Sequence, residues 1–173
     1  MCDDAYTCVM MLFSVIAIVC VGYVACYLFL FQVLPIFFRQ SRLPLGRRAA
    51  VSAALIVVLS LIAYAVGLNV PNPDLGNLIL HMFGGGFLAS FLCYVVVRDT
   101  GIVLTRFQFF VITFLIVLAL GVANEHLEFL IQTFTRYTYA DTVQDTWIDL
   151  VNNSIGAFLG ASLFTTRIHK SLA

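Results

Sequence analysis

Charged residues are scarce in this sequence. Lysine and arginine together number 9, aspartate and glutamate number 9, and charged residues make up 10% of the 173 residues, whereas hydrophobic residues make up 62%. A soluble domain of this size needs far more polar side chains to cover its surface, and the mean hydropathy of +1.02 excludes that class. The composition therefore predicts an integral membrane protein.

Several familiar signals are also missing. The sequence has no CxxC, HExxH or Glu-x-x-His motif, and no Ser or Cys nucleophile beside an evident base. It has no internal repeat and no basic surface of the kind that binds nucleic acid, so we expect no nucleic-acid partner. The N-terminus carries Asp3 and Asp4 where a signal peptide has Lys or Arg. We therefore predict one transmembrane domain over residues 1–173, without a cleaved leader.

Five apolar stretches are long enough to cross a bilayer. A helix needs about 20 apolar residues to cross about 30 Å of hydrocarbon. The first stretch is longer than this, so it must tilt or protrude, and Pro35 marks where its membrane part ends. The predicted fold is an all-α, polytopic bundle with an outer polar segment at 124–147. The five spans are residues 9–38, 49–68, 78–97, 107–123 and 148–165.

The charges divide unequally between the two ends of these spans. Eight of the nine basic residues fall on one side and only Arg136 on the other, whereas Asp99 is the only acid on the basic side. Because short basic loops stay in the cytoplasm, we predict an outer N-terminus and a cytoplasmic C-terminus, in the plasma (inner) membrane. The remaining acids then lie toward the outside.

Two carboxylates follow one face of the fourth span as it reaches the outer surface. Because an α-helix turns about 100° per residue, four side chains share this face, whereas His126 points elsewhere. The four are Gly121, Glu125, Glu128 and Gln132. This face either meets protein or a wet cavity, or forms the solvated end of a frayed helix, and both interpretations stay open.

Three aspartates recur at four-residue intervals where the last span begins: Asp141, Asp145 and Asp149. Like charges at this spacing destabilise an isolated helix by about 0.2–0.5 kcal/mol per pair. The helix dipole accounts for acids in a first turn. It does not account for Asp149, which a long apolar run follows. Because acids inside a membrane usually face a cavity or a partner, we interpret Asp149 as functional.

Small residues in two spans predict a close helix crossing. Glycines lie one turn after His81 in the third span, and a Gly-x-x-x-Gly pattern lies about two turns after Asp149 in the fifth. Such patterns let two backbones approach closely within a bilayer. A crossing here would bring His81 toward Asp149 and Asn153. The expected packing residues are Gly84, Gly85, Gly156 and Gly160.

This order of polar residues and glycines resembles the VanZ-like family of small membrane proteins. The matching positions are His81, Glu125, Arg136, Asp149, Asn153, Gly156 and Gly160. The sequence departs from that pattern at Glu128, where the family has Gln. Its Glu-x-x-Glu and its Asp-rich entry to the last span are also similar to the YjdF-like membrane proteins. The resemblance implies a cell-envelope role, including association with glycopeptide resistance, and implies no settled reaction.

Four functions compete. We rank them as binding of an envelope lipid headgroup, precursor or cation in an outward-facing pocket, then an accessory subunit of a larger membrane complex, then a metal-dependent membrane enzyme. Transport comes last because the inner halves of the spans lack ionisable residues. Expected partners are membrane lipids, with other membrane proteins or a second copy as alternatives. The predicted ligand-binding residues are His81, Glu125, Glu128, Arg136, Asp149 and Asn153. The predicted ligands of a divalent cation are His81, Glu125, Glu128, Asp145 and Asp149.

Overall fold

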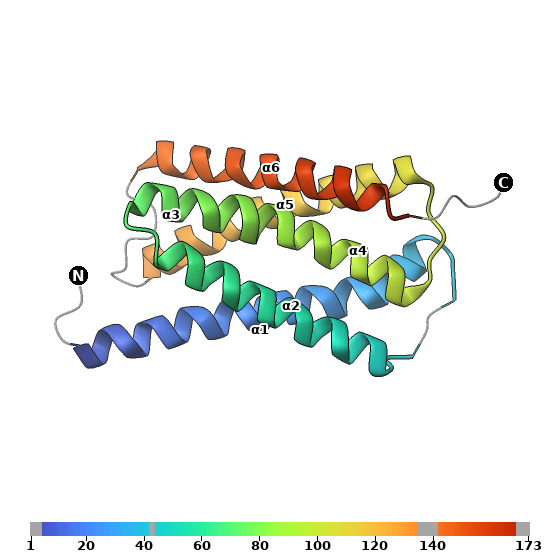
Figure 1. Cartoon of the computed structure of the whole chain (residues 1–173), viewed down its shortest axis with the longest axis horizontal. Helices are drawn as coiled ribbons and strands as arrows, with labels where there is room; N and C mark the ends of the chain where they lie inside the picture. Colours follow the sequence, from blue (N-terminus) through green and yellow to red (C-terminus); the bar gives the residue numbers. More distant parts are fainter. Residues whose placement is uncertain (1–4, 42–43, 135–141, 169–173) are drawn as a thin grey trace.

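The computed structural model describes residues 5–41, 44–134 and 142–168, with side chains from residue 16 onward. Every regular element within these ranges is a helix (Figure 1), which confirms the predicted all-α membrane bundle. The elements are α1 (Ala5–Phe37), α2 (Arg47–Leu68), α3 (Pro73–Ile79), the π-helix η1 (Leu80–Leu88), α4 (Ala89–Thr100), α5 (Arg106–Phe134) and α6 (Val143–Thr165).

Four helical stretches are long and apolar enough to cross a membrane: Ile16–Phe37, Arg47–Leu68, Pro73–Thr100 and Arg106–Phe134. The fifth predicted span, α6, has 23 residues but a less apolar composition, because polar side chains such as Asp149 and Asn153 occupy its buried face. Its opposite face carries exposed apolar side chains, among them Val151 and Phe158. Since lipid contacts only the outward face, α6 has the pattern of a membrane helix with a polar interior side.

The third span begins earlier than its apolar run suggests. The helix starts at Pro73, because the side chain of Asn72 accepts hydrogen bonds from the backbone N–H groups of Asp74 (2.9 Å) and Leu75 (3.2 Å). It continues without a break to Thr100, and Gly101 ends it in the left-handed conformation at φ 67°. The span is therefore longer than the predicted 78–97.

The middle of this span is a π-helix, where the sequence periodicity predicts an α-helix. π-helices are rare and occur mostly at functional sites. The nine residues of η1 include three consecutive glycines, whose lack of side chains permits the unusual backbone and a close neighbour. The wider turn places both His81 and Gly85 against Asn153 of α6.

Helices α5 and α6 extend into the predicted outer polar segment. The apolar part of α5 ends near residue 123, but the helix continues to Phe134, and α6 begins at Val143. The side chain of Thr142 accepts a hydrogen bond from the backbone N–H of Asp145 (3.2 Å) and caps α6. Much of segment 124–147 is therefore helical, since a change from apolar to polar side chains does not by itself end a helix.

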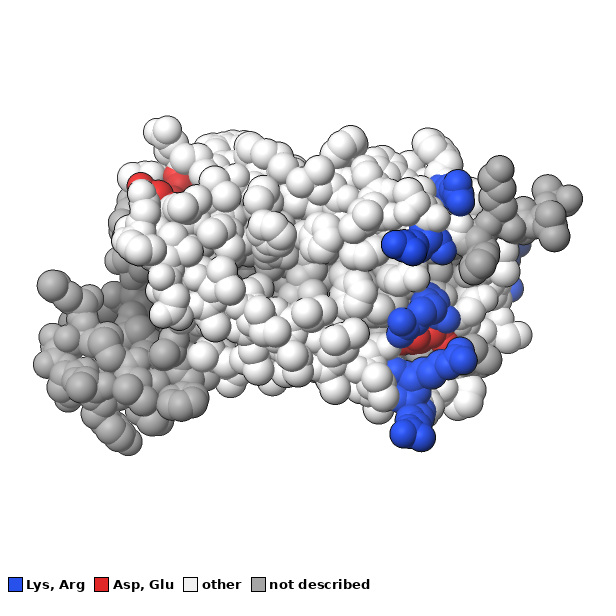
Figure 2. Space-filling model, viewed as in Figure 1, with Lys and Arg blue, Asp and Glu red and all other residues white. Residues whose placement is uncertain are grey.

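The two ends of the bundle carry opposite charge. Figure 2 shows the described Lys and Arg side chains gathered at one end, with acidic side chains at the other. We call the end containing Arg47, Arg98 and Arg167 the basic end, and the end containing Asp74 and Asp145 the acidic end. This charge separation agrees with the division read from the sequence, while the orientation of the bundle in the membrane stays a prediction.

The half of the bundle near the basic end is filled with large side chains. The ring of Phe164 on α6 lies 5.3–5.5 Å from those of Phe87, Phe91 and Tyr94, measured between ring centres. Phe109 on α5 is fully buried against the same group. Aromatic contacts of this kind contribute beyond their buried area, so this half is a packed core. The buried polar residues Glu125, Asp149 and Asn153 lie in the other half.

Candidate functional site

A close crossing of η1 and α6 determines the geometry of the polar residues. A Cβ added at Gly86 would lie 2.6 Å from the Cα atom of Gly156, and one added at Gly156 would overlap the backbone of Met82. Farther along, a Cβ at Gly160 would lie 2.6 Å from that of Ser90. These contacts occur where the glycine pattern predicts a crossing, because only glycine allows two backbones this close.

Two of the predicted packing glycines behave differently from each other. A Cβ at Gly85 would overlap the side-chain oxygen of Asn153, so Gly85 faces α6. A Cβ at Gly84 would meet nothing within 4 Å, so Gly84 is not a packing residue. Its carbonyl accepts a hydrogen bond from the hydroxyl of Tyr23 on α1 (2.6 Å). The turn of the π-helix directs Gly84 away from α6 and toward a cavity.

The crossing brings together three potential metal ligands from three helices. His81 of η1, Glu125 of α5 and Asp149 of α6 each offer one ligand atom, and these atoms all lie within 4.8 Å of one another. The Nε2 atom of His81 is 3.4 Å from the Oδ2 atom of Asp149. Glu125 and Asp149 are only 8% and 3% exposed. We call these three residues the acidic trio.

Two asparagines surround the acidic trio. The side-chain amide of Asn77 donates a hydrogen bond to the Oδ1 atom of Asp149 (2.7 Å), and that of Asn153 lies 3.4 Å from the Nδ1 atom of His81. The sequence pattern predicts Asn153 as a site residue but not Asn77. Asn77 lies four residues before His81 at the start of an apolar run, and this spacing is the signal that would have identified it.

Some buried polar atoms around the trio have no hydrogen-bond partner. Within the described ranges these include Oε1 of Glu125, Oδ1 of Asn153 and Nδ2 of Asn152. A buried polar atom without a partner costs about 1–3 kcal/mol, and native structures rarely leave one in that state without a reason. Two carboxylates this close also repel each other unless a proton or a cation lies between them. The arrangement therefore calls for a positively charged species.

A cavity of about 510 Å³ adjoins the acidic trio. One part of its wall is polar and includes His81, Glu128, Asp149 and Asn153. Another part is apolar and includes Ile18 of α1. This volume lies within the usual range of about 300–1,000 Å³ for small-molecule sites. The cavity is thus large enough for an organic ligand beside the trio.

Glu128 and Asp145 lie near the trio but are not among its three grouped ligand residues. Glu128 lines the same cavity, where its Oε1 atom accepts a hydrogen bond from the side chain of Asn124 (2.6 Å). Asp145 is half-buried in the first turn of α6 and does not belong to the group of potential metal ligands. Arg136 and Asp141 fall outside the residues that the structure describes.

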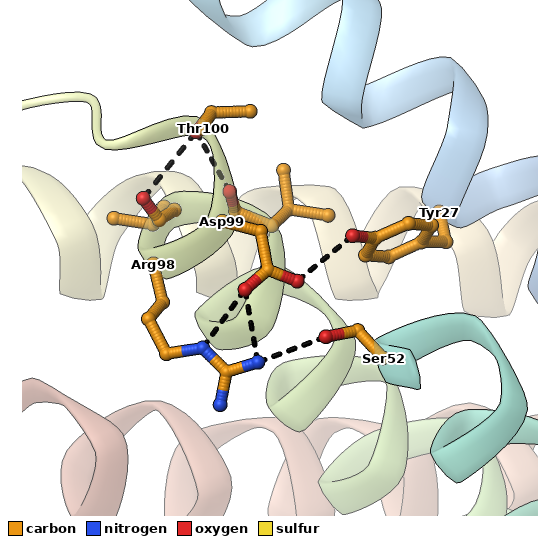
Figure 3. A network of polar contacts seen from close by, with 7 residues as sticks. Tyr27, Ser52, Arg98, Asp99 and Thr100 are labelled. Atoms are coloured by element: carbon orange, nitrogen blue, oxygen red, sulfur yellow. Dashed lines mark hydrogen bonds and ion pairs between the residues drawn. The ribbon is translucent and has the colours of Figure 1, made fainter. Parts of the chain in front are cut away.

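A second polar network, which the sequence pattern does not predict, joins three helices near the basic end (Figure 3). The carboxylate of Asp99 accepts hydrogen bonds from the Tyr27 hydroxyl (2.9 Å) and from Nε of Arg98 (2.9 Å). The same guanidinium donates to the hydroxyl of Ser52 (2.8 Å). The Asp99 side chain is 1% exposed and that of Arg98 is 49% exposed. Every member has a partner, so this network is a structural tie between α1, α2 and α4.

Comparison with known families adds one result. A family model described as "Predicted membrane protein (DUF2238)" matches residues 5–171. The chain belongs to the DUF2238 family. The YjdF-like membrane proteins, the second of the two resemblances in the sequence, are this same family, and the match does not extend to the VanZ-like family. No curated protein and no solved structure matches the chain. This DUF2238 protein is accordingly a multi-pass membrane protein.

Proposed function

We propose that this DUF2238 protein binds a divalent cation through His81, Glu125 and Asp149, at the side of a cavity within the membrane. The observation that supports the proposal most directly is the buried Oε1 atom of Glu125, which has no partner and belongs to a group of ligand atoms within 4.8 Å of one another. A cation at this position would neutralise both carboxylates and satisfy that oxygen.

The donor set defines which cations suit the trio. One imidazole nitrogen and two carboxylate oxygens favour Zn²⁺, Mn²⁺ or Fe²⁺ over cations that prefer oxygen ligands alone. The three side chains come from three different helices, so a bound cation would also link η1, α5 and α6. Binding would therefore stabilise the folded bundle.

Asn153 has the position of a supporting residue for a metal-bound histidine. A histidine that ligates through Nε2 carries its proton on Nδ1 and donates it to a neighbouring acceptor. The side chain of Asn153 lies 3.4 Å from Nδ1 of His81, and its Oδ1 atom has no partner. Rotation of this amide by half a turn would present the oxygen to Nδ1. The unpartnered oxygen and the histidine proton would then satisfy each other.

We infer that the trio lies toward the outer side of the plasma (inner) membrane. Asp149 is six residues after the start of α6, which corresponds to about 9 Å along the helix, so the trio lies below the acidic end rather than at mid-bundle. The basic end faces the cytoplasm by the positive-inside rule. A cation bound at the trio would then exchange with the envelope rather than with the cytoplasm.

Metal titration of the purified protein tests the proposal. Protein stripped with a chelator in neutral detergent is dialysed against Zn²⁺ or Mn²⁺, and bound metal and thermal unfolding are measured. We expect one equivalent per chain, and stabilisation by about 2.7 kcal/mol at a metal concentration 100 times Kd. Glu125→Gln and His81→Gln should abolish both effects.

Two matched variants serve as controls. His126→Gln removes an exposed imidazole on the same side of the bundle, and Glu128→Gln removes a carboxylate of the cavity wall outside the trio. Both should retain the bound equivalent. Metal binding that Glu125→Gln leaves unchanged, or that His126→Gln removes, would contradict the proposal. A complete lack of metal binding would refute the proposal and would favour a proton shared by the two carboxylates.

A further inference from the structure

We propose that the cavity holds an amphiphile from the bilayer, with its anionic head on the cation and its alkyl chain between α1 and α5. This inference rests on the proposed cation site. It adds the class of ligand, the route of entry and the residues that accommodate the chain. Three observations support it: the separation of α1 from α5, the two-sided lining of the cavity, and the number of protein ligands at the trio.

The helices leave an opening between α1 and α5. Within the described residues α1 packs on α2 and α4, and α5 packs on α6, η1 and α4. No Cα atom of α1 lies within 8 Å of one in α5 or α6. Both α1 and α5 nevertheless line the cavity, so they face each other across it. The space between them is a lateral passage from the surrounding lipid to the trio.

The lining of the cavity matches a molecule with a polar head and an apolar chain. His81 and Asp149 of the acidic trio occupy one part of the wall together with Asn77 and Asn153. Toward α1 and α4 the wall is formed by side chains such as Ile18, Val19 and Leu92. Gly22 of α1 also lines this part, and a Cβ added there would meet nothing within 4 Å. A chain of methylene groups fits this part, since its wall is as apolar as the lipid that the chain would leave.

The trio would leave the cation with room for a further ligand. Three protein ligands with an open position are typical of zinc sites that bind substrate or water, whereas structural zinc sites have four. Two carboxylates and a neutral imidazole balance the charge of a divalent cation. A phosphate or carboxylate head would therefore bind through the metal. No described Lys or Arg lines this cavity that could bind the head instead.

Spectroscopy of the cobalt-loaded protein tests the inference. The visible absorption of bound Co²⁺ changes when a new ligand joins it, and the probes are dodecyl phosphate and inorganic phosphate. We expect dodecyl phosphate to change the spectrum at a concentration at least about tenfold lower than inorganic phosphate does. Burial of about two methylene groups is enough for a tenfold difference in affinity. Equal concentrations for the two probes would indicate a site for free anions and overturn the inference.

A pair of adjacent substitutions separates the two proposals. Gly22→Phe fills the cavity near the chain, whereas Val21→Phe adds the same ring to a position that is 67% exposed and outside the cavity lining. Gly22→Phe should remove the advantage of dodecyl phosphate, and Val21→Phe should keep it, with Co²⁺ affinity unchanged in both. If Co²⁺ fails to bind at all, the cation site itself is refuted. If Co²⁺ binds but the two variants respond alike, only the amphiphile is refuted.

Discussion

The two polar clusters of this protein use similar residues in opposite ways. Near the basic end one buried carboxylate, that of Asp99, has an arginine and a tyrosine as donors. Near the acidic end Glu125 and Asp149 lie together with a histidine, and an oxygen of Glu125 has no partner. Each residue of the first cluster has a hydrogen-bond partner within the protein, whereas the second leaves a buried carboxylate oxygen without one. A count of hydrogen-bond partners therefore separates a structural network from a candidate site.

The packing around the two clusters also differs, because large side chains fill the half that contains the first and glycines lie beside the second. Aromatic rings around Phe164 fill the half near the basic end. Glycines and a cavity of about 510 Å³ occupy the half near the acidic end, whereas the hollow of similar volume at the basic end is lined by exposed residues, namely Arg47, Arg48, Val51 and Arg98. A membrane helix gains little from packing apolar side chains against a neighbour, because lipid is equally apolar. Open space maintained inside such a bundle is more consistent with a ligand than with stability.

The orientation of the two ends has the largest expected effect, because labelling is all-or-none. Leu45→Cys near the basic end and Asp74→Cys near the acidic end are both exposed positions. In a variant without the five native cysteines, a membrane-impermeant thiol reagent added to intact cells should label Asp74→Cys only. The nearby Asn72 is also exposed, but a cysteine there would remove the side chain that caps α3. Labelling of Leu45→Cys alone would show that the basic end faces outward, opposite to the predicted orientation.

The glycine crossing should be the most sensitive part of the acidic half. Gly156→Ala forces a Cβ into the backbone of η1 at Met82, so we expect a loss of about 1–3 kcal/mol or more in unfolding free energy. Gly84→Ala is the matched control, since its Cβ meets nothing within 4 Å. Ala161, which lies on the same helix, would not be a suitable control because it is fully buried. Thermal unfolding in detergent that shows equal, small effects for both alanines would contradict the crossing.

The same substitution at the two clusters should change stability in different directions. Asp99→Asn weakens charge-assisted hydrogen bonds from Arg98 and Tyr27, so we expect a loss of about 1–3 kcal/mol. Asp149→Asn removes one of two repelling carboxylates and adds an amide donor near Glu125. In metal-free protein its unfolding temperature should stay unchanged or rise, while metal binding is lost. A clear destabilisation by Asp149→Asn would make the trio a structural network like that of Asp99.

Much of the candidate site is predictable from local sequence. The spacing of Glu125, Asp149 and Asn153 on their helices places them on inward faces, since they interrupt apolar runs that contact lipid on the other side. The spacing of Asn77 before His81 marks it as a candidate, but its hydrogen bond to Asp149 is not predictable in this way, because Asp149 lies 72 positions along the chain. The network of Tyr27, Ser52 and Asp99 escapes prediction for the same reason. Its members look like ordinary residues of separate spans.

The amino-acid sequence alone indicates the membrane class, the positions of the long apolar helices and the separation of charge between the two ends. These follow from composition and from periodicity within single helices, which act over a few residues. Three other features emerge only when the helices pack: η1 is a π-helix, Gly84 faces a cavity while Gly85 faces α6, and α1 stays apart from α5. Those features depend on which helices pack together, because the contacts that produce them join residues far apart in the chain.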